Sequence, residues 1–414
     1  MTTPKQSASS AARGASGSKE QRAKSVLEKV LSVLTRLGFA PLKEKQKSSD
    51  TTPPKTDKAV AAITELAAHG DLVAQALAPH INTLRPHLAS PHPRLFYTLT
   101  SIRGGKQTIS VLAGHIVGPQ HPYTEAFGMF AALEASSVIY PKETKIIRYN
   151  SLGDQESLQA YLKEAQGALR RAISALSPSL QATLRAEGPH GIWRLSAQRH
   201  PVLFDFPRPF EHLSPTSREM LQEILDILEG NQFPYEIDDL LIPAPSIFSH
   251  GVFSIHAHSE SNGTTDDGEI AAQGGSLAEL FRDASGSDAP TFSLFSFALR
   301  VPEAPPRHLP EPPTRTKVFY SPIGKDARAV SFTVVKALQG ARIPFVTNIA
   351  CGRFCDAIAN AERKRIPYVV FVGTPEAFRR VAVVRRMEDR AQREVPFAEL
   401  KEFLSRIEQR WNSC

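Results

Sequence analysis

The sequence predicts an α+β protein in two parts: a larger unit whose antiparallel sheet is flanked by helices, and a smaller C-terminal α/β unit. In the first part, short apolar runs separated by turns stand beside long amphipathic segments, which is typical of an α+β fold. Six prolines fall within residues 301–313, a stiff stretch that marks a domain boundary. Beyond it, strand-like runs alternate with helical segments of about 10–15 residues, which favours a mostly parallel sheet.

Composition excludes several classes of protein. The chain has 414 residues, of which 41% are hydrophobic and 22% charged, so it is neither a collagen, nor a coiled coil, nor disordered throughout. It has no apolar stretch of about 18 residues, so we expect no membrane span. Three cysteines cannot form a disulfide framework, so we expect a reducing compartment, the cytoplasm.

The N-terminal region is expected to change from a tail to a helix at residue 19. Residues 1–18 are rich in Ser, Ala and Gly and contain no acid, which indicates a disordered tail. The same composition suits an organellar transit peptide, so an organellar location is the alternative. Residues 19–37 present one apolar stripe and predict a helix that stops at Gly38. A polar loop follows, and then a second predicted helix over about 58–80.

The rest of the first part, up to residue 300, predicts strands and helices in turn. Strands are expected at Leu95–Leu99, Thr108–Leu112, His115–Val117, Ile146–Tyr149, Tyr235–Ile237, Val252–His258 and Ile270–Ala272. Helices are expected at Tyr123–Ser136, Gln155–Ala175 and Pro215–Glu229, the last with Ser217 as its N-cap. The final strands read as an antiparallel meander, and residues of about 175–230 read as a helical insertion.

The C-terminal part, residues 315–414, follows the Pro-rich linker at 301–314 and is basic. It carries 19 Lys and Arg against 10 Asp and Glu, whereas residues 58–314 carry 19 against 27. A basic module of this size is typical of nucleic-acid binding, and a solvated basic surface is the alternative.

Several segments, taken in order, carry a resemblance to a known family. They are LGFAPLKEK (37–45), FYTLTSIR (96–103), AGHIVGPQHPYTEA (113–126), YNSLGDQESLQAYLKEAQGAL (149–169), FPYEIDDLLIPAPSIFSHGVF (233–253) and QGGSLAEL (273–280). This series resembles the histidyl-tRNA synthetases, and residues 317–404 resemble the anticodon-binding domain of that family. The resemblance covers about residues 25–410. It implies a class II synthetase-like core, an anticodon-binding-like domain and a homodimer, with Val26, Val30 and Leu34 near the dimer interface.

The resemblance also implies that the histidine-binding motifs are degenerate. The family motif R-G-L-D-Y-Y falls on residues 243–248 of this chain, with Pro243 at the arginine, Ser246 at the acid, and Ile247 and Phe248 at the tyrosines. In the second motif, G-G-R-Y-D, the arginine and tyrosine positions hold Ser276 and Leu277. Negative charge develops on the reacting phosphate in the transition state, and losing one hydrogen-bond donor to that charge raises the activation free energy by about 2.7–4 kcal/mol. We therefore name no catalytic residue and expect aminoacylation to be absent.

Two arginines remain at positions that the resemblance assigns to the nucleotide site, Arg103 and Arg300. Their usual acidic neighbours are missing, because Gly105, His115 and Leu299 stand at those positions. We expect no cofactor, and the sequence leaves open whether ATP still binds. We expect no metal site either, because His250, His256 and His258 lack a partner at metal-ligand spacing.

Basic residues in the C-terminal part form groups that suit phosphate contacts. The residues expected to bind RNA are Arg353, Arg363, Lys364, Arg379, Arg380, Arg385 and Arg386. Among the neighbouring aromatic residues, we expect Tyr368 and Phe378 to lie in the core.

The leading hypothesis is a synthetase-like protein that binds tRNA or another structured RNA without charging it. One alternative is a regulatory subunit resembling the partner of ATP phosphoribosyltransferase in histidine biosynthesis, which requires a protein partner. The other is a divergent, active histidine–tRNA ligase.

Overall fold

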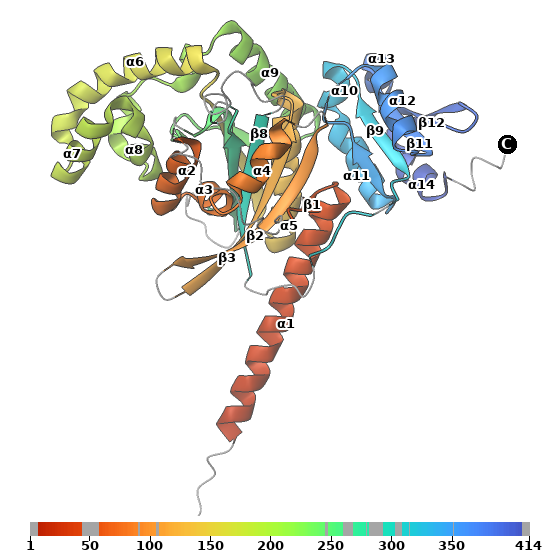
Figure 1. Cartoon of the computed structure of the whole chain (residues 1–414), viewed down its shortest axis with the longest axis horizontal. Coiled ribbons are helices and arrows are strands. Elements are labelled where there is room, and N and C mark those ends of the chain that lie inside the picture. Colours follow the sequence, from red (N-terminus) through yellow and green to blue (C-terminus); the bar gives the residue numbers. More distant parts are fainter. Residues whose placement is uncertain are drawn as a thin grey trace, which may run out of the picture.

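Among the residues that the structure describes, two sheets organise the protein, one of eight strands and one of five (Figure 1). The computed structural model describes residues 7–43, 58–89, 92–104, 107–244, 247–259, 268–278, 280, 293–302, 309–313, 315–350 and 352–407. We call the part built around the eight-stranded sheet the large domain, and the part built around the five-stranded sheet the C-terminal domain. Within the described residues, no helix combines the length and the apolarity that crossing a membrane requires.

The sheet of the large domain is antiparallel in its interior and parallel at both edges, in the order β1-β2-β3-β8-β7-β6-β4-β5. Its strands are β1 (Ala40–Pro41), β2 (Arg94–Gly104), β3 (Gln107–Gly118), β4 (Thr144–Ser151), β5 (Tyr235–Ile237), β6 (Ser249–His258), β7 (Glu269–Ser276) and β8 (Ser293–Val301). Of the three strands expected to form an antiparallel meander, β6 and β7 pair antiparallel, but β5 lies parallel to β4 instead. Strand β8, which was not expected, continues the antiparallel pairing beside β7. The predicted α+β class is therefore confirmed.

Helices cover both faces of this sheet. The helices of the large domain are α1 (Ser7–Arg36), α2 (Lys58–Ala68), α3 (Leu72–Leu77), α4 (Ile81–Leu88), α5 (Pro122–Ile139), α6 (Gln155–Ala172), α7 (Pro178–Glu187), α8 (Trp193–Ala197) and α9 (Pro215–Gly230). Short 3-10 turns lie at Ile173–Ala175, Gly188–Ile192, Pro201–Asp205 and Pro209–His212. Helices α1, α5 and α9 share one apolar cluster with one face, and α2, α3 and α4 share another cluster with the opposite face.

Two helix predictions in the large domain were also wrong. The single helix expected over 58–80 is broken into α2 and α3, because Gly70 turns with φ +91° and the Asp71 side chain caps α3 by accepting from the amide of Ala74. The N-cap of α9 is Ser214 and not Ser217, because Pro215 occupies the first helical position and the Ser214 hydroxyl accepts from the amide of Ser217.

Helix α1 projects from the body as a long rod (Figure 1). It begins at Ser7, inside the alanine-containing segment 1–18 that was expected to be a tail, and residues 1–6 lie outside the described residues. At its other end, Val30 and Leu34 are fully buried within this chain, in the cluster that includes α5. These two side chains are therefore not available to a partner subunit, and the homodimer stays a prediction.

The C-terminal domain has the strand order β10-β9-β11-β12-β13. Its strands are β9 (Val318–Pro322), β10 (Phe345–Thr347), β11 (Tyr368–Val372), β12 (Val381–Arg386) and β13 (Gln392–Pro396). Its helices are α10 (Lys325–Ala329), α11 (Ser331–Gly340), α12 (Phe354–Arg363), α13 (Thr374–Arg379) and α14 (Phe397–Ser405). The first three strands in this order are parallel, as expected, and the other pairings are antiparallel. Strand β13 was missed because its sequence, QREVP, is mostly polar.

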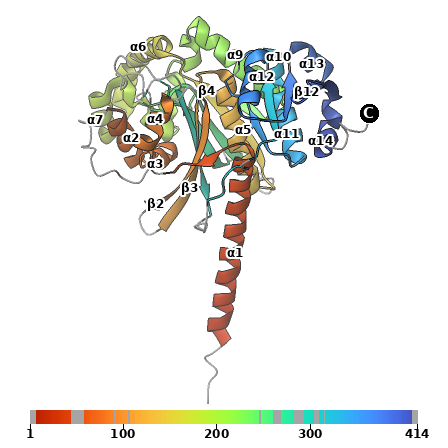
Figure 2. The ribbon, with the colours of Figure 1, turned by 45° about the vertical axis from the view of Figure 1, so that its right-hand side comes forward.

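The two domains share a hydrophobic core, so they are not merely joined by a linker. Helix α11 of the C-terminal domain lies beside α5 of the large domain (Figure 2). Phe332 of α11 stacks on Phe130 of α5 with 4.5 Å between ring centroids, and also lies against Tyr123 and Phe233. The described part of the Pro-rich segment packs on the large domain, since the Tyr97 hydroxyl donates to the carbonyl of Pro310 at 2.7 Å. The relative position of the domains is therefore fixed by side-chain packing.

Candidate functional site

The positions assigned to the histidine motifs come together in space, but as part of an apolar core. Ile247, Phe248 and Leu277 are all nearly inaccessible and belong to one cluster with the covering helices α2, α3 and α4. Pro243 lies in the loop before them, and Ser246 lies outside the described residues. Burying each of these large apolar side chains contributes about 1.5–3 kcal/mol to the stability of the fold. At these positions, this face of the sheet therefore serves packing.

The covering helices supply matching apolar side chains to this face. Their buried residues are Ala59, Ile63, Leu66, Val73, Ala74, Ala76, Leu77, Ile81, Leu84 and Leu88. From the sheet they meet Val111, Ala113 and Ala298. The described residues of this apolar cluster include no charged side chain that could bind a triphosphate. Burying a triphosphate there would remove its charges from water without compensation, at a large cost in free energy.

The backbone positions of the two arginines assigned to the nucleotide site are not cross-strand neighbours. Arg103 pairs with Thr108 of β3, while Arg300 of β8 pairs with Val111 of the same strand. The two positions are thus about 10 Å apart along the strands and two strand spacings apart across them. Arg300 is exposed. Burial and Glu269 raise the pKa of Tyr140, and the charge of Arg300 acts in the opposite direction and lowers it.

A cavity of about 310 Å³ persists beside the histidine-motif positions, lined by Pro243, Phe248, Asp71 and His256 among others. Two of its polar side chains, Asp71 and His256, are engaged in the fold. The carboxylate of Asp71 accepts from the amide of Ala74 at 2.8 Å, and burial raises its pKa to about 6. The ring of His256 lies 3.0 Å from the hydroxyl of Ser254. The apolar walls with a few polar groups suit a small amphipathic molecule.

A buried polar network, which the sequence did not predict, lies at the end of the sheet. Glu125 of α5 accepts from the amide of Gln120 at 3.0 Å and from the hydroxyl of Tyr149 at 3.4 Å. The hydroxyl of Ser276, one of the degenerate motif positions, donates to Gln120 at 3.2 Å. Burial raises the pKa of Glu125 to about 7, with the charge of His250 acting in the opposite direction. A glutamate inside the apolar run of α5 is the signal that could have located it.

The three histidines weighed as metal ligands do not form a recognisable site. His256 and His258 stack with 6.4 Å between ring centroids. In the part of the chain that the structure describes, no three His, Cys, Asp or Glu side chains are grouped so that they could hold a metal ion.

The predicted RNA-binding residues lie in two places, one group on α13 and β12 and the other at the ends of α12. Arg379 donates two hydrogen bonds to Glu394, at 2.7 and 3.0 Å, and Arg386 is paired with Asp389. Arg380 lies 5.6 Å from the ring centroid of Phe397. Arg385 and Arg386 are adjacent in β12 and so face opposite sides of the sheet. The remaining residues, Arg353, Arg363 and Lys364, stand at the two ends of α12.

Tyr368 is buried as expected, but the prediction for Phe378 was wrong. Its side chain is 76% exposed on α13, directly before Arg379 and Arg380. The reason is that this short helix buries Ala377, and the next residue is rotated by about 100° toward solvent. The C-terminal domain therefore presents an aromatic ring beside two arginines.

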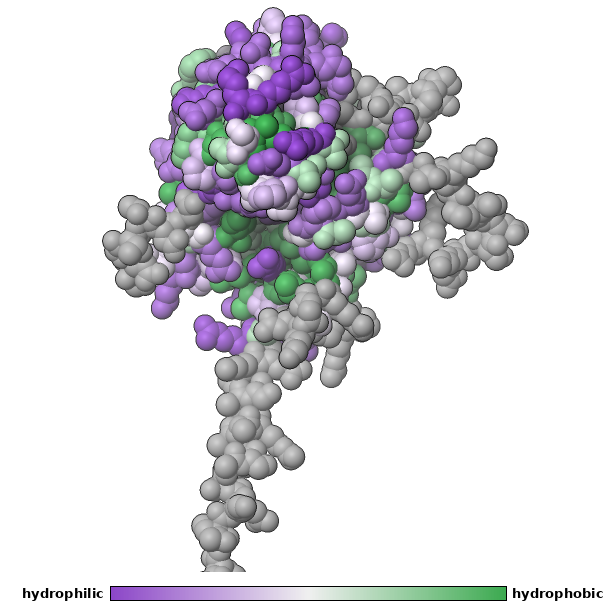
Figure 3. Space-filling view, turned by 90° about the vertical axis from the view of Figure 1, so that its left-hand side faces the viewer, coloured by the Kyte–Doolittle hydropathy of each residue, from purple (hydrophilic) through white to green (hydrophobic). Residues whose placement is uncertain are grey.

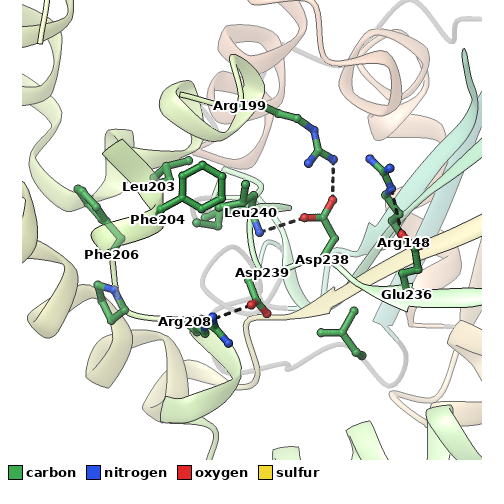
Figure 4. Close-up of a pocket in the computed structure, with 13 residues that line it drawn as sticks. Arg148, Arg199, Leu203, Phe204, Phe206, Arg208, Glu236, Asp238, Asp239 and Leu240 are labelled. Carbon is green, nitrogen blue, oxygen red and sulfur yellow. Dashed lines mark hydrogen bonds and ion pairs between the residues drawn. The ribbon is translucent and has the colours of Figure 1, made fainter. Parts of the chain in front are cut away.

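A second cavity, of about 320 Å³, lies between the helical insertion and the edge strand β5 (Figure 4). Its three arginines each face a carboxylate: Arg199 and Asp238 are 2.6 Å apart, Arg208 and Asp239 3.3 Å, and Arg148 and Glu236 3.6 Å. Because each charge has a partner, this cavity has little net attraction for an ion. On this side of the molecule, apolar side chains are interspersed with polar ones (Figure 3).

Comparison with known proteins places these features in context. Residues 317–407 match the family model described as an anticodon binding domain. The histidine–tRNA ligase of Geobacillus thermodenitrificans is 22% identical over 291 residues, which cover 70% of this chain and 67% of that protein. Histidine–tRNA ligase 1 of Shouchella clausii is 24% identical over 260 residues, which cover 62% of this chain and 60% of that protein.

Two solved structures are also similar over most of their length. Apo histidyl-tRNA synthetase of S. aureus aligns with 94% of this chain and 96% of its own, at 15% identity and a TM-score of 0.48. A protein from Bacillus halodurans described as an ATP phosphoribosyltransferase regulatory subunit/histidyl-tRNA synthetase aligns with 85% of this chain and 94% of its own. Its identity is 12% and its TM-score 0.41.

Proposed function

We propose that this chain, which is similar to the histidine–tRNA ligases and matches an anticodon binding domain over residues 317–407, binds tRNA or another structured RNA without charging it. The C-terminal domain would make the RNA contacts. The large domain would serve as a structural platform.

The apolar filling of the large domain supports the loss of catalysis. Amino-acid activation needs donors that stabilise negative charge on a phosphate, and it needs polar groups that hold the amino acid. At the motif positions this chain has Ile247, Phe248 and Leu277, which pack against the helices α2, α3 and α4. Neither requirement is met by these side chains.

The exposed ring of Phe378 close to Arg380 is the observation that carries RNA binding, whereas the neighbouring Arg379 is already paired with Glu394. Aromatic side chains next to cationic groups stack on unpaired bases while the cations hold the backbone. Base stacking of this kind contributes about 1–3 kcal/mol per base. The position of this pair within the matched anticodon-binding domain supports the same reading.

Loss of catalysis is tested by histidine-dependent ATP–pyrophosphate exchange. We expect no exchange above a blank without protein, with the Geobacillus thermodenitrificans ligase assayed in parallel as the positive control. Exchange at the rate of that ligase would contradict the proposal and favour the divergent active ligase.

RNA binding is tested by titrating the full chain with tRNA-His, an unrelated tRNA and duplex RNA at two salt concentrations. We expect tRNA-His to bind most tightly, with an affinity that falls as salt rises. Phe378→Ala should weaken binding about tenfold. Phe204→Ala is the matched control, because Phe204 is equally exposed, at 76%, but lies in the insertion. Equal binding of all three RNAs, or no effect of Phe378→Ala, would count against this site.

A second candidate function is favoured by the cavity of about 310 Å³ at the histidine-motif positions. A regulatory subunit needs a small-molecule site, and this cavity would supply it. Histidine at millimolar concentration should then raise the unfolding temperature, and a partner enzyme should co-purify. The absence of both effects would remove this candidate.

The proposal also retains a homodimer. Its interface would use the partly buried Val26 and Val33 of α1, since Val30 and Leu34 are enclosed by their own chain. Light scattering of the purified protein at two concentrations gives its mass directly, and a monomer at both would exclude the dimer.

A further inference from the structure

A third cavity lies where the two domains meet, and we call it the seam cavity. It measures about 470 Å³ and is lined by residues of both domains. Arg94, at the start of β2, comes from the large domain. Asn348, Asn360, Arg363 and Lys364 come from the C-terminal domain, after β10 and along α12.

The charge of this cavity is one-sided. Its lining contains Arg94, Arg363 and Lys364, together with His92, and among the residues that the structure describes it contains no carboxylate. In the described part of the chain, the three cations form no ion pair. The cavity at the insertion differs in this respect, because each of its arginines faces an acid. Cations gathered in a recess without counter-charge create a potential that attracts anions.

Lys364 is one of the cations that line the seam cavity, and its surroundings disfavour its charged form. Its ammonium lies 5.9 Å from the ring centroid of Phe319, at the apolar side of the cavity. Although Lys364 is exposed, partial desolvation lowers the pKa of its ammonium, and the neighbouring charge of Arg363 lowers it further. An anion placed between these side chains would relieve that repulsion, since an opposite charge favours the charged form of a lysine.

The shape and the donors of the seam cavity suit one chemical group. Arginine presents a planar fork that matches a phosphate, and lysine binds phosphate as a point charge. The apolar part of the lining, with Phe96, Phe319 and Ile349, would take the face of a base or a ribose. The volume lies within the range of small-ligand sites, about 300–1,000 Å³.

We propose that the seam cavity binds a phosphate group, carried either by a free mononucleotide or by the backbone of RNA. With RNA as the source, the inference rests on the proposed function and deepens it. It makes Arg94 of the large domain a phosphate-binding residue, although no RNA contact was expected outside the C-terminal domain.

The test compares the full-length chain with Arg94→Ala, Lys364→Ala and Arg94→Lys. Arg185→Ala on α7 is the control, because it removes an exposed arginine far from the cavity (Figure 1). Binding of AMP and of inorganic phosphate is measured by calorimetry. Binding of labelled tRNA-His is measured by fluorescence anisotropy at two salt concentrations.

We expect Arg94→Ala and Lys364→Ala each to weaken phosphate-dependent binding about tenfold or more, and Arg185→Ala to leave it unchanged. For RNA, Arg94→Ala and Lys364→Ala should each also reduce the salt slope by about 0.7–0.9, because each removes one cation. Arg94→Lys should keep part of the affinity, because it retains the charge and loses the fork. Circular dichroism of each variant checks that the fold is intact.

The outcomes separate the sources of the phosphate and the two proposals. Loss of AMP binding alone identifies a free nucleotide, and loss of RNA binding alone identifies the RNA backbone; either supports the seam site. If the wild type binds RNA and both alanine variants bind it equally well, with no AMP binding to lose, the seam site is wrong and the proposed function stands. If the wild type binds AMP but no RNA, and both alanine variants lose AMP binding, the seam site stands and the proposed function fails; AMP binding that both variants keep would overturn the seam site.

Discussion

Arg328 of α10 and Glu223 of α9 form an ion pair across the domain junction, with 2.6 Å between Nε and Oε1. Neither side chain is more than 9% exposed. Two neighbouring hydrogen bonds reinforce the contact, because the Asn231 amide donates to the carbonyl of Ala329 and accepts from the amide of Phe332. The junction is therefore held by polar groups as well as by the aromatic stack.

The first prediction concerns the two partners of this pair. Glu223→Ala leaves a buried guanidinium without its carboxylate, so the free energy of unfolding should fall by about 3–5 kcal/mol. The double variant Glu223→Leu with Arg328→Met should lose much less, because both charges are removed together. Urea unfolding at pH 7 measures both, and equal losses would show that the pair is not buried as described.

The second prediction concerns Phe332, which is fully buried among rings from both domains. Phe332→Ala should lower the free energy of unfolding by about 3–5 kcal/mol. In a Trp411→Phe background, where Trp193 of the large domain is the remaining tryptophan, it should also separate the unfolding of the two domains, so that far-UV circular dichroism and tryptophan fluorescence cease to coincide. Phe204→Ala, on an exposed ring, should change neither observable. Coincident transitions in Phe332→Ala would mean that the domains are coupled elsewhere.

The third prediction concerns the pH dependence of Glu125. Its pKa is about 7 in the folded protein against an ordinary value of 4.5, so the folded state binds more protons between these values. Its contribution to the free energy of unfolding therefore falls as pH rises from about 4.5 to about 7. Glu125→Gln imitates the protonated form. The stability difference between variant and wild type should rise with pH across this window, by up to about 3 kcal/mol.

The difference in stability between Glu125→Gln and the wild type cancels the contribution that other titrating groups make to the pH dependence. His115 and His121 have pKa values lowered by burial, to about 3 and about 4, and they reduce stability as pH falls below 6.5. Both are unchanged in the variant, so their effect drops out. A difference that does not vary between pH 4.5 and 8 would show that Glu125 is ionised in the folded state.

The fourth prediction concerns the apolar filling of the large domain. Leu77→Ala on α3 should cost about 2–5 kcal/mol of stability, because Leu77 is fully buried in the cluster with Leu277. It should not create histidine-dependent pyrophosphate exchange, because the space it opens is lined by apolar groups. Unfolding and exchange assays on the same preparation check both parts. A gain of exchange would mean that a usable substrate site lies beneath this helix.

Periodicity predicted most of the regular elements, and the reasons for the misses are local. The helix expected over 58–80 failed at Gly70 and Asp71, where a turn glycine and a capping side chain outweigh a continuous apolar pattern. The mostly polar sequence of β13 hid a strand that is stabilised by pairing with β12.

The sequence predicted only those properties of the candidate site that follow from which residues stand at the motif positions. The apolar residues at positions 247, 248 and 277 indicated a lost polar site from the sequence alone. That the covering helices fill the same space depends on tertiary packing. The seam cavity joins Arg94 to Lys364, which are 270 positions apart in the chain, and no local pattern connects them.

The shared aromatic core has a further consequence for binding energetics. A ligand that bridges two domains on a flexible tether must first bring them together, and it loses affinity to that ordering. Here the stack around Phe332 and the pair of Arg328 with Glu223 already hold both walls of the seam cavity in place. The site is thus preorganised, and substitutions that loosen the junction should weaken phosphate binding without touching any residue that contacts the ligand.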